Sequence, residues 1–259
     1  MSDAEARPAV RYEVESGVAW LTIDRPESRN ALSRAVRDGL WEGVRRFNDD
    51  DSAGVLVLTG EGDRAFCAGG DLKEMSTTSL QVPPPDFLPV FGRNIEVPKV
   101  TIAAVNGVAF AGGFLLAQMC DLVVAADTAR FAITEAKVGR GTPWATPLPW
   151  LVPPRIAMEL LVTGEPIDAE RALAVGLVNR VVAPDVLRST TQQLAATIIA
   201  NAPLSVRAAK RTVHLAAGDL YGRLYDQADE IWEPVYTSED AQEGPRAFSE
   251  RRTPEWKGR

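Results

Sequence analysis

Short blocks of hydrophobic residues, separated by polar and glycine-rich stretches, run along this chain of 259 residues. In the first block, 10–23, apolar and polar positions alternate on both sides of Ser16-Gly17, a pattern that predicts a β-hairpin. The apolar runs 54–60 and 100–104 predict buried strands, because a strand covered on both faces has no polar side. The stretch 114–120 is apolar on nearly every side of a helix, so we expect a buried helix there.

Polar residues mark where two further helices begin and end. Ser33 is expected to be the N-cap of a helix that runs to about Asn48, because its side chain can accept a hydrogen bond from a free N–H group of the first turn. By the same argument Asp168 is expected to cap a helix that runs through Ala174. Gly176 is expected to close that helix, since glycine readily adopts the left-handed conformation found just past helix ends.

The remaining blocks predict a mixed α/β fold with a helical end. The stretches 121–127 and 129–134 are typical of two short strands that lead to Glu135, and 178–182 of another. The stretch 138–150 contains too much proline and glycine for a regular element, and a helix is expected around 155–163. From Pro184 onward the pattern is helical, with helices expected at 186–200, 203–217 and, with interruptions, 221–249.

Composition limits the class of protein. With 46% hydrophobic residues the chain can bury one substantial core. A net charge of −7 argues against a nucleic-acid-binding protein, which needs clustered basic residues to neutralise phosphates. Two cysteines and a polar stretch 1–10 favour a reduced, cytoplasmic setting. No membrane association is expected, because 103–119, the most apolar region, is interrupted by Asn106 and glycines.

Two glycine turns follow predicted buried strands and carry the chemical signal. The run 54–60 is followed by Gly69-Gly70, and the run 100–104 by Gly112-Gly113 and the predicted buried helix. The first N–H groups of a helix have no internal partner, so two such turns can aim free donors at one oxygen that gains negative charge. The alternative is that the glycines only let helix and strand pack closely.

The motifs around these turns resemble a known superfamily. Ala-Phe-Cys-Ala-Gly-Gly-Asp-Leu-Lys-Glu-Met at 65–75, Val-Asn-Gly-Val-Ala-Phe-Ala-Gly-Gly at 105–113 and Met-Cys-Asp at 119–121 resemble the crotonase (enoyl-CoA hydratase/isomerase) superfamily, with likeness from about Val18 to about Lys257. The resemblance implies a spiral of repeated ββα units with an acyl-CoA site over 1–183, and a C-terminal helical trimerisation region over 184–259. It also implies an acyl-CoA substrate, no cofactor besides the coenzyme A of that substrate, and a homotrimer or a dimer of trimers.

The resemblance also assigns catalytic roles. It places the backbone N–H groups of Gly70 and Gly112 on the thioester carbonyl as an oxyanion hole. Typical hydratases of the superfamily carry two glutamates; Glu135 matches the second, whereas Leu115 stands in place of the first. A single carboxylate suffices to move a double bond, so isomerisation is favoured over efficient hydration. Slow hydration, thioester hydrolysis and an acyl-CoA-binding protein without turnover remain alternatives.

Two expectations concern the surroundings of Glu135. A catalytic Glu135 is expected to be buried near Phe114 and Trp144, which raises its pKa toward neutrality. As an ordinary structural carboxylate it would instead pair with Lys137 or Arg140.

The resemblance also implies which further residues contact the substrate. The phosphates of coenzyme A are expected to contact Arg25, Arg29 and Lys73. The proline-rich stretch 76–86 is expected to cover the acyl chain. The full set of predicted substrate-binding residues is Arg25, Arg29, Ala68, Asp71, Leu72, Lys73, Phe110, Leu115, Trp144, Phe248 and Lys257.

Other kinds of site find no support in the sequence. His214, the lone histidine, lies in a predicted helix and is expected to be structural. No spacing of cysteine and histidine indicates a metal site, so no metal is expected.

Overall fold

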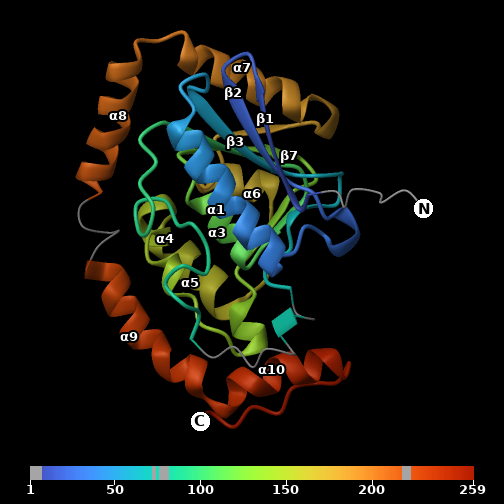
Figure 1. Ribbon diagram of the computed structural model, residues 1–259. Helices are drawn as coiled ribbons and strands as arrows, with labels where there is room; N and C mark the ends of the chain where they lie inside the picture. Colours follow the sequence, from blue (N-terminus) through green and yellow to red (C-terminus); the bar gives the residue numbers. More distant parts are fainter. Residues whose placement is uncertain (1–7, 72–73, 76–81, 218–222) are drawn as a thin grey trace.

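The larger of two β-sheets has six strands and lies in the upper half of the view in Figure 1. The computed structural model describes residues 8–71, 74–75, 82–217 and 223–259. The sheet begins with an antiparallel pair joined by Ser16 and Gly17, both with positive φ, so the predicted hairpin is confirmed. Every other neighbouring pair is parallel. In order across the sheet the strands are β1 (Val10–Glu15), β2 (Val18–Ile23), β3 (Val55–Gly60), β5 (Val100–Val105), β7 (Leu122–Ala126) and β10 (Arg180–Val182).

A smaller sheet has four short strands: β4 (Ala65–Cys67), β6 (Val108–Phe110), β8 (Arg130–Ala132) and β9 (Ile167–Asp168). β4, β6 and β8 are parallel to one another, whereas β9 is antiparallel to β8. The pairs β3–β4, β5–β6 and β7–β8 each place their first strand in the larger sheet and their second in the smaller one. This repetition carries the chain forward as a spiral, and it brings the carboxyl ends of β4, β6 and β8 to one edge.

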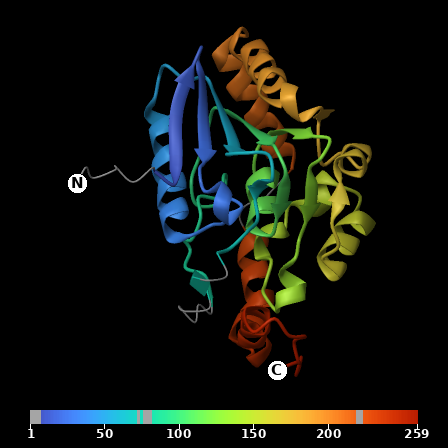
Figure 2. The same cartoon turned by 90° about the vertical axis from the view of Figure 1, so that its right-hand side faces the viewer.

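Alternation along the strands of the larger sheet builds a core on each face. Val18 and Trp20 pack with residues of α7 (Leu187–Ile199), and Ala19 and Leu21 with residues of α1 (Arg34–Asp49). Figure 2 shows these two helices on opposite sides of the sheet. The larger sheet is thus buried on both faces, as its apolar runs predicted.

The helices begin within two residues of the predicted positions, but the capping interaction at α1 differs from the predicted one. α3 (Gly112–Gln118) begins earlier than expected and is buried from Gly113 to its end. Asp168 caps α6 (Ala169–Ala174) by accepting a hydrogen bond of 2.8 Å from the Arg171 N–H group. Ser33 is the N-cap residue of α1, but its side chain makes no capping bond. The Glu74 carboxylate instead accepts a 2.8 Å hydrogen bond from the Arg34 N–H group.

The expectation of no regular element over 138–150 is wrong. This segment begins with the end of a 3₁₀ helix, η2 (Glu135–Val138), and contains η3 (Pro143–Ala145) and α4 (Leu148–Leu151). Proline lies in the first turn of η3 and α4, where its missing N–H group is not needed. α5 (Pro154–Thr163) then follows as predicted.

The chain ends in helices, as predicted, and the last two support the end of the smaller sheet. After η4 (Pro184–Val186) and α7 come α8 (Pro203–Ala216), α9 (Arg223–Thr237) and α10 (Glu239–Ser249). α9 contacts η3 and α10 contacts η2. A Cβ atom on Gly244 of α10 would lie 2.1 Å from the Val138 carbonyl oxygen, so this contact needs glycine. Within the described ranges no helix has the length and apolar character that a membrane crossing requires.

Candidate active site

The three parallel strands of the smaller sheet deliver the three predicted catalytic residues to one edge. Gly70 follows β4, Gly112 follows β6 and Glu135 follows β8. The pairing of β4 with β6 shifts its register before Cys67, which lies opposite Ala109. β6 and β8 are paired in register up to their ends, where Phe110 lies opposite Ala132. One residue further, the Ala111 N–H group donates a 2.9 Å hydrogen bond to the Ala132 carbonyl. The turn into α3 is therefore tied to the strand that leads to Glu135.

The two glycine turns lie against each other. Gly69 has a φ of 93°, and a Cβ atom on it would lie 3.0 Å from the Phe110 carbonyl oxygen and 3.5 Å from the Gly112 nitrogen. A Cβ atom on Gly113 would lie 2.0 Å from the Cys67 carbonyl oxygen. Glycine is needed at these positions because the two backbones approach too closely for a side chain. The close packing that the sequence offered as one alternative is thus present, and it brings the two turns together. The oxyanion role of Gly70 and Gly112 stays a prediction.

The loop that contains η1 (Pro26–Ser28) supports the first glycine turn from outside. The Arg29 carbonyl accepts a 3.1 Å hydrogen bond from the Ala68 N–H group, and the Leu32 N–H group donates one of 2.8 Å to the Gly69 carbonyl. The Arg25 guanidinium lies 3.1 Å from the Asp71 carboxylate. Four predicted binding residues, Arg25, Arg29, Ala68 and Asp71, therefore lie together beside Gly70.

Two predicted binding residues of this turn, Leu72 and Lys73, lie outside the described residues. Most of the stretch 76–86, predicted to cover the acyl chain, also lies outside them.

Glu135 is buried, as predicted, and its environment favours the protonated form. The residue is 8% exposed, and its Oε2 atom has no hydrogen-bond partner among the described residues. Burial raises the pKa of Glu135 to about 8, although its own backbone N–H group, the Trp144 side chain and the charge of Arg140 oppose the rise. Lys137 pairs with Glu165 at 2.8 Å instead of with Glu135. The pKa of this carboxyl group is thus close to neutral pH, as proton transfer at that pH requires.

Aromatic side chains pack beside Trp144, whose side chain interacts with this carboxyl group. The Trp144 ring centroid lies 6.2 Å from that of Phe114, which in turn packs edge-on against Phe131 at 6.4 Å. Leu115 lies buried in α3, and Phe110, at the end of β6, is partly exposed. The predicted acyl-binding residues therefore come from three segments: the end of β6, the middle of α3, and η3.

Sequence reasoning missed several polar groups at this site. Gln118, the last residue of α3, donates a 3.0 Å hydrogen bond from Nε2 to the Trp144 carbonyl. Thr142 is 4% exposed. Tyr236 of α9 donates a 2.9 Å hydrogen bond to the Gly141 carbonyl, and its ring stacks under the Arg140 guanidinium. One signal was present: Gln118 is a polar residue in a helix that is otherwise apolar on all sides.

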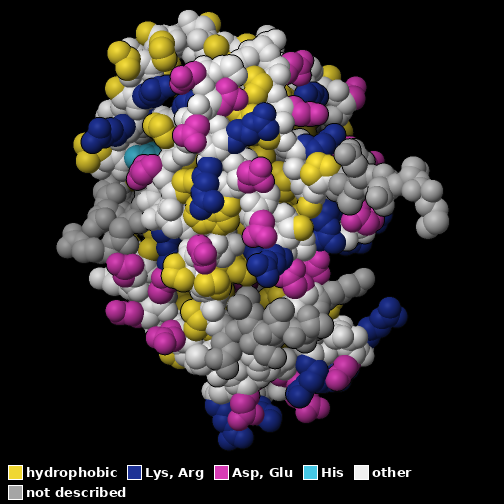
Figure 3. All heavy atoms as spheres, viewed as in Figure 1, with side chains coloured by type: hydrophobic (Ala, Val, Ile, Leu, Met, Phe, Trp, Pro, Cys, Tyr) yellow, Lys and Arg dark blue, Asp and Glu magenta, His cyan; other side chains and the backbone are white. Residues whose placement is uncertain are grey.

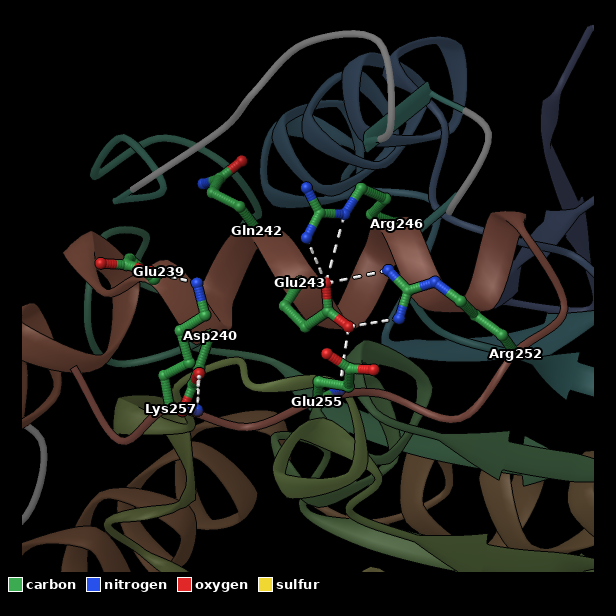
Figure 4. Close-up of a pocket in the computed structure, with 8 residues that line it drawn as sticks. All are labelled: Glu239, Asp240, Gln242, Glu243, Arg246, Arg252, Glu255 and Lys257. Atoms are coloured by element: carbon green, nitrogen blue, oxygen red, sulfur yellow. Dashed lines mark hydrogen bonds and ion pairs between the residues drawn. The ribbon is translucent and has the colours of Figure 1, made fainter.

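The two predicted binding residues near the C-terminus lie in a different setting (Figure 4). Lys257 is 2.9 Å from the Glu239 carboxylate, at a pocket of about 360 Å³ between α10 and the residues after it. Phe248 of α10 is 60% exposed. At the centre of this pocket Glu243 pairs with Arg246 and Arg252 and accepts a 2.9 Å hydrogen bond from the Glu255 N–H group. These ion pairs hold the chain end on α10, and contact of Phe248 or Lys257 with coenzyme A stays a prediction.

His214 has the structural role that was predicted. Its Nε2 atom lies 3.2 Å from the Asp121 carboxylate, which also pairs with Lys210 at 2.8 Å and accepts a 2.8 Å hydrogen bond from the Thr101 N–H group. Burial tends to raise the pKa of Asp121, but the bonds from His214 and Lys210 lower it overall. This cluster joins α8 to the larger sheet, whereas Glu135 follows a strand of the smaller sheet.

Comparison with known proteins agrees with the arrangement of strands and turns. The model of the family "Enoyl-CoA hydratase/isomerase" matches residues 13–259. Carnitinyl-CoA dehydratase of Citrobacter koseri is 39% identical over 249 residues, which cover 92% of this chain and 94% of that protein. (E)-Benzylidenesuccinyl-CoA hydratase of Thauera aromatica is 38% identical over 96% of this chain and 99% of its own. The crystal structure of carnitinyl-CoA hydratase from Mycobacterium avium superposes with a TM-score of 0.89 at 37% identity, covering 98% of this chain and 100% of that chain.

Proposed function

The chain belongs to the enoyl-CoA hydratase/isomerase family, whose members act on coenzyme A thioesters, and we propose that it catalyses the reversible addition of water to a 2-enoyl-CoA. Relatives that match it over almost their whole length are named dehydratase or hydratase, which supports addition or removal of water as the reaction. The chemistry of the proposal comes from the residues at the edge of the smaller sheet.

One observation supports the proposal: β4, β6 and β8 are parallel neighbours, and Gly70, Gly112 and buried Glu135 follow their carboxyl ends. The N–H groups of Gly70 and Gly112 are proposed to bind the thioester carbonyl oxygen. Gly112 is the first residue of α3, so its N–H group has no partner within the helix. Two such donors stabilise an enolate by about 3 kcal/mol each, which makes the proton on carbon 2 removable.

Glu135 is proposed to be the acid and base at carbon 2. With its pKa at about 8, both protonation states are populated near neutral pH. The carboxylate form removes the proton from carbon 2 of a saturated thioester, and the protonated form returns a proton to the enolate.

The substrate is proposed to enter along the first glycine turn. Arg25 and Arg29 are proposed to contact the phosphates of coenzyme A, beside Ala68 and Asp71. Phe110, Leu115 and Trp144 are proposed to contact the acyl group.

A second reaction, isomerisation of a 3-enoyl-CoA to the 2-enoyl form, is favoured by Leu115. This residue is apolar and 3% exposed, and it stands where a typical hydratase of the superfamily has its first glutamate. Glu135 is therefore the one carboxylate of the usual pair that this chain keeps. One carboxylate is enough to take a proton from carbon 2 and return it to carbon 4.

A substrate panel separates the possible reactions. We expect the purified protein to hydrate crotonyl-CoA, measured by loss of the conjugated thioester absorbance, faster than it isomerises 3-hexenoyl-CoA. The reverse order would replace the proposal with isomerisation. Release of free coenzyme A as the main product would make the protein a thioester hydrolase. Tight acyl-CoA binding with no turnover of any of these substrates would leave a binding protein.

We further propose that the chain assembles as a homotrimer or a dimer of trimers through its C-terminal helices. Leu204 and Leu215 of α8 are 78% and 79% exposed and lie about three helical turns apart on one face. Figure 3 shows hydrophobic side chains gathered on the surface over α8. A single exposed apolar residue is ordinary, whereas this face carries two leucines with Ala208 and Arg211 between them, and contacts between subunits are enriched in apolar residues and arginine.

Charges on this helix face are expected to dissociate the assembly. The double substitution Leu204→Glu and Leu215→Glu should lower the molar mass measured by size-exclusion chromatography with light scattering from a multiple of the chain mass to that of one chain. Met158→Glu, at an exposed apolar position of α5, is the control and should leave the mass unchanged. A monomeric unmodified protein, or an unchanged mass of the double variant, would contradict the proposal.

A further inference from the structure

Buried polar atoms without partners gather around the Trp144 segment. Among the described residues, Glu135 Oε2, Gln118 Oε1 and Thr142 Oγ1 are all enclosed by protein and have no hydrogen-bond partner. Gln118 is 6% exposed and Thr142 4% exposed. An enclosed polar atom is normally paired, because its loss of water is otherwise uncompensated, so these atoms need a polar group that the protein alone does not supply.

Each of the three residues is linked to one short turn, η3. Gln118 binds the Trp144 carbonyl through Nε2, which leaves its Oε1 atom as a free acceptor. The Trp144 side chain interacts with the Glu135 carboxyl group. Thr142 is the residue before η3, whose middle residue is Trp144, and its carbonyl accepts a 3.0 Å hydrogen bond from the Ala145 N–H group. Gln118 and Glu135 therefore contact the turn that Thr142 begins, and the three residues meet around η3.

The position of Gln118 on α3 connects it with Leu115. Residues three apart in a helix lie on the same face, so Gln118 stands one turn beyond Leu115 on the face that holds the buried side chain of Leu115. Leu115 itself offers no group that binds water or a hydroxyl. Gln118 offers an acceptor on the same face, and Thr142 offers a hydroxyl that both donates and accepts.

We infer that Gln118 and Thr142 bind the hydroxyl group on carbon 3 of a 3-hydroxyacyl-CoA beside Glu135. This inference rests on the proposed function and assigns the residues that hold the oxygen lost or gained as water. The substrate hydroxyl donates its hydrogen to Gln118 Oε1, and Thr142 Oγ1 donates to the substrate oxygen. A short acyl chain with an oxygen on carbon 3 then satisfies the enclosed polar atoms that the free protein leaves unpaired.

The elimination step balances with Glu135 as the only acid and base. The Glu135 carboxylate takes the proton from carbon 2, and the electrons of that bond pass to the thioester, which becomes an enolate. The enolate electrons then form the double bond between carbons 2 and 3. The bond between carbon 3 and oxygen breaks, and the leaving hydroxyl takes the proton that Glu135 received. The products are one 2-enoyl-CoA and one water, and Glu135 returns to its carboxylate form. Gln118 and Thr142 exchange no proton and only fix the position of the oxygen.

The experiment compares two reactions that differ in the hydroxyl group. Dehydration of 3-hydroxybutyryl-CoA, each enantiomer separately, needs the hydroxyl to be bound; exchange of the carbon 2 hydrogens of butyryl-CoA with D₂O needs only the enolate. Gln118→Met and Thr142→Val keep the side-chain size and remove the hydrogen-bonding group. We expect each substitution to lower kcat/KM for dehydration by about tenfold or more, and to change the exchange rate by about twofold or less.

The control is Thr191→Val, which removes an enclosed hydroxyl from α7, where it donates 2.8 Å to the Leu187 carbonyl. It should leave the ratio of dehydration to exchange unchanged. Equal losses of both reactions in the Gln118 and Thr142 variants would assign these residues a purely structural role and overturn the inference. Unchanged dehydration in both variants would also overturn it. A lack of exchange by the unmodified protein would instead contradict the proposed enolate chemistry, so the two failures are distinguishable.

Discussion

Replacing Glu135 by glutamine is expected to lower the rate of hydrogen exchange at carbon 2 of butyryl-CoA by about a thousandfold, without a comparable loss of affinity. A positioned general base contributes about 10² to 10⁴ in rate, and here it is the only carboxyl group proposed to reach carbon 2. Glutamine has nearly the same shape and no charge to bury, so Glu135→Gln should fold and bind. Exchange measured by NMR in D₂O and the dissociation constant of butyryl-CoA measured by calorimetry test both parts.

Glu165→Gln is the matched control for this substitution. Glu165 is an exposed carboxylate that pairs with Lys137 of η2, close to Glu135 in the same region of the fold. Loss of its surface ion pair should change the exchange rate by less than about twofold, because exposed pairs contribute about 0 to 1 kcal/mol. Exchange by Glu135→Gln at more than about a tenth of the original rate would remove Glu135 from the role of base.

The pH profile of the same reaction tests the protonation state of Glu135. Exchange begins with the carboxylate form, and burial raises the pKa of that group to about 8. At pH 6 only about 1% of the protein then carries the carboxylate, so kcat/KM for exchange should rise about tenfold per pH unit and level off near pH 8. A profile that is already flat above pH 5 would mean that the carboxyl group is ionised at neutral pH and not desolvated.

The larger sheet follows from the sequence because its signals are local. The turn at Ser16 and Gly17 and the apolar runs of β3 and β5 each fix an element from a few neighbouring residues. The helical end of the chain is predictable for the same reason. The prediction fails at η3 and α4, because proline is excluded only from helix interiors and here occupies first-turn positions that tolerate it.

The sequence predicts the residues of the candidate site only where they lie in a recognisable motif. The glycine turns at Gly70 and Gly112 follow recognisable strands, and their contact is a consequence of the parallel smaller sheet. Gln118 and Thr142 carry no such motif, and their importance comes from burial without partners, which is a property of the folded chain. The Glu74 carboxylate that caps α1 in place of Ser33 is likewise a contact between distant segments.

Gly113→Ala is expected to destabilise the protein by about 3 kcal/mol, against the intrinsic preference of helices. Alanine is favoured over glycine inside a helix by about 1 kcal/mol, so helix propensity alone predicts a more stable protein. However, the new Cβ atom would lie 2.0 Å from the carbonyl oxygen of Cys67, a backbone atom of β4 that no side-chain rotation can move. Relieving this overlap requires α3 and β4 to separate, and overpacking of this kind costs about 1 to 3 kcal/mol or more.

Urea unfolding at pH 7 decides between the two effects, with Gly54→Ala as the control. At Gly54 the nearest atom to a new Cβ is 3.2 Å away and belongs to the flexible side chain of Ile199, so this substitution should shift the unfolding midpoint much less. Because the strand and helix ends that Gly113 joins also bring Gly69 and Gly112 together, Gly113→Ala should lose carbon 2 exchange along with stability. If Gly113→Ala were as stable as the unmodified protein, α3 and β4 would not be in the close contact described here. The approach of the two glycine turns would then have no structural explanation.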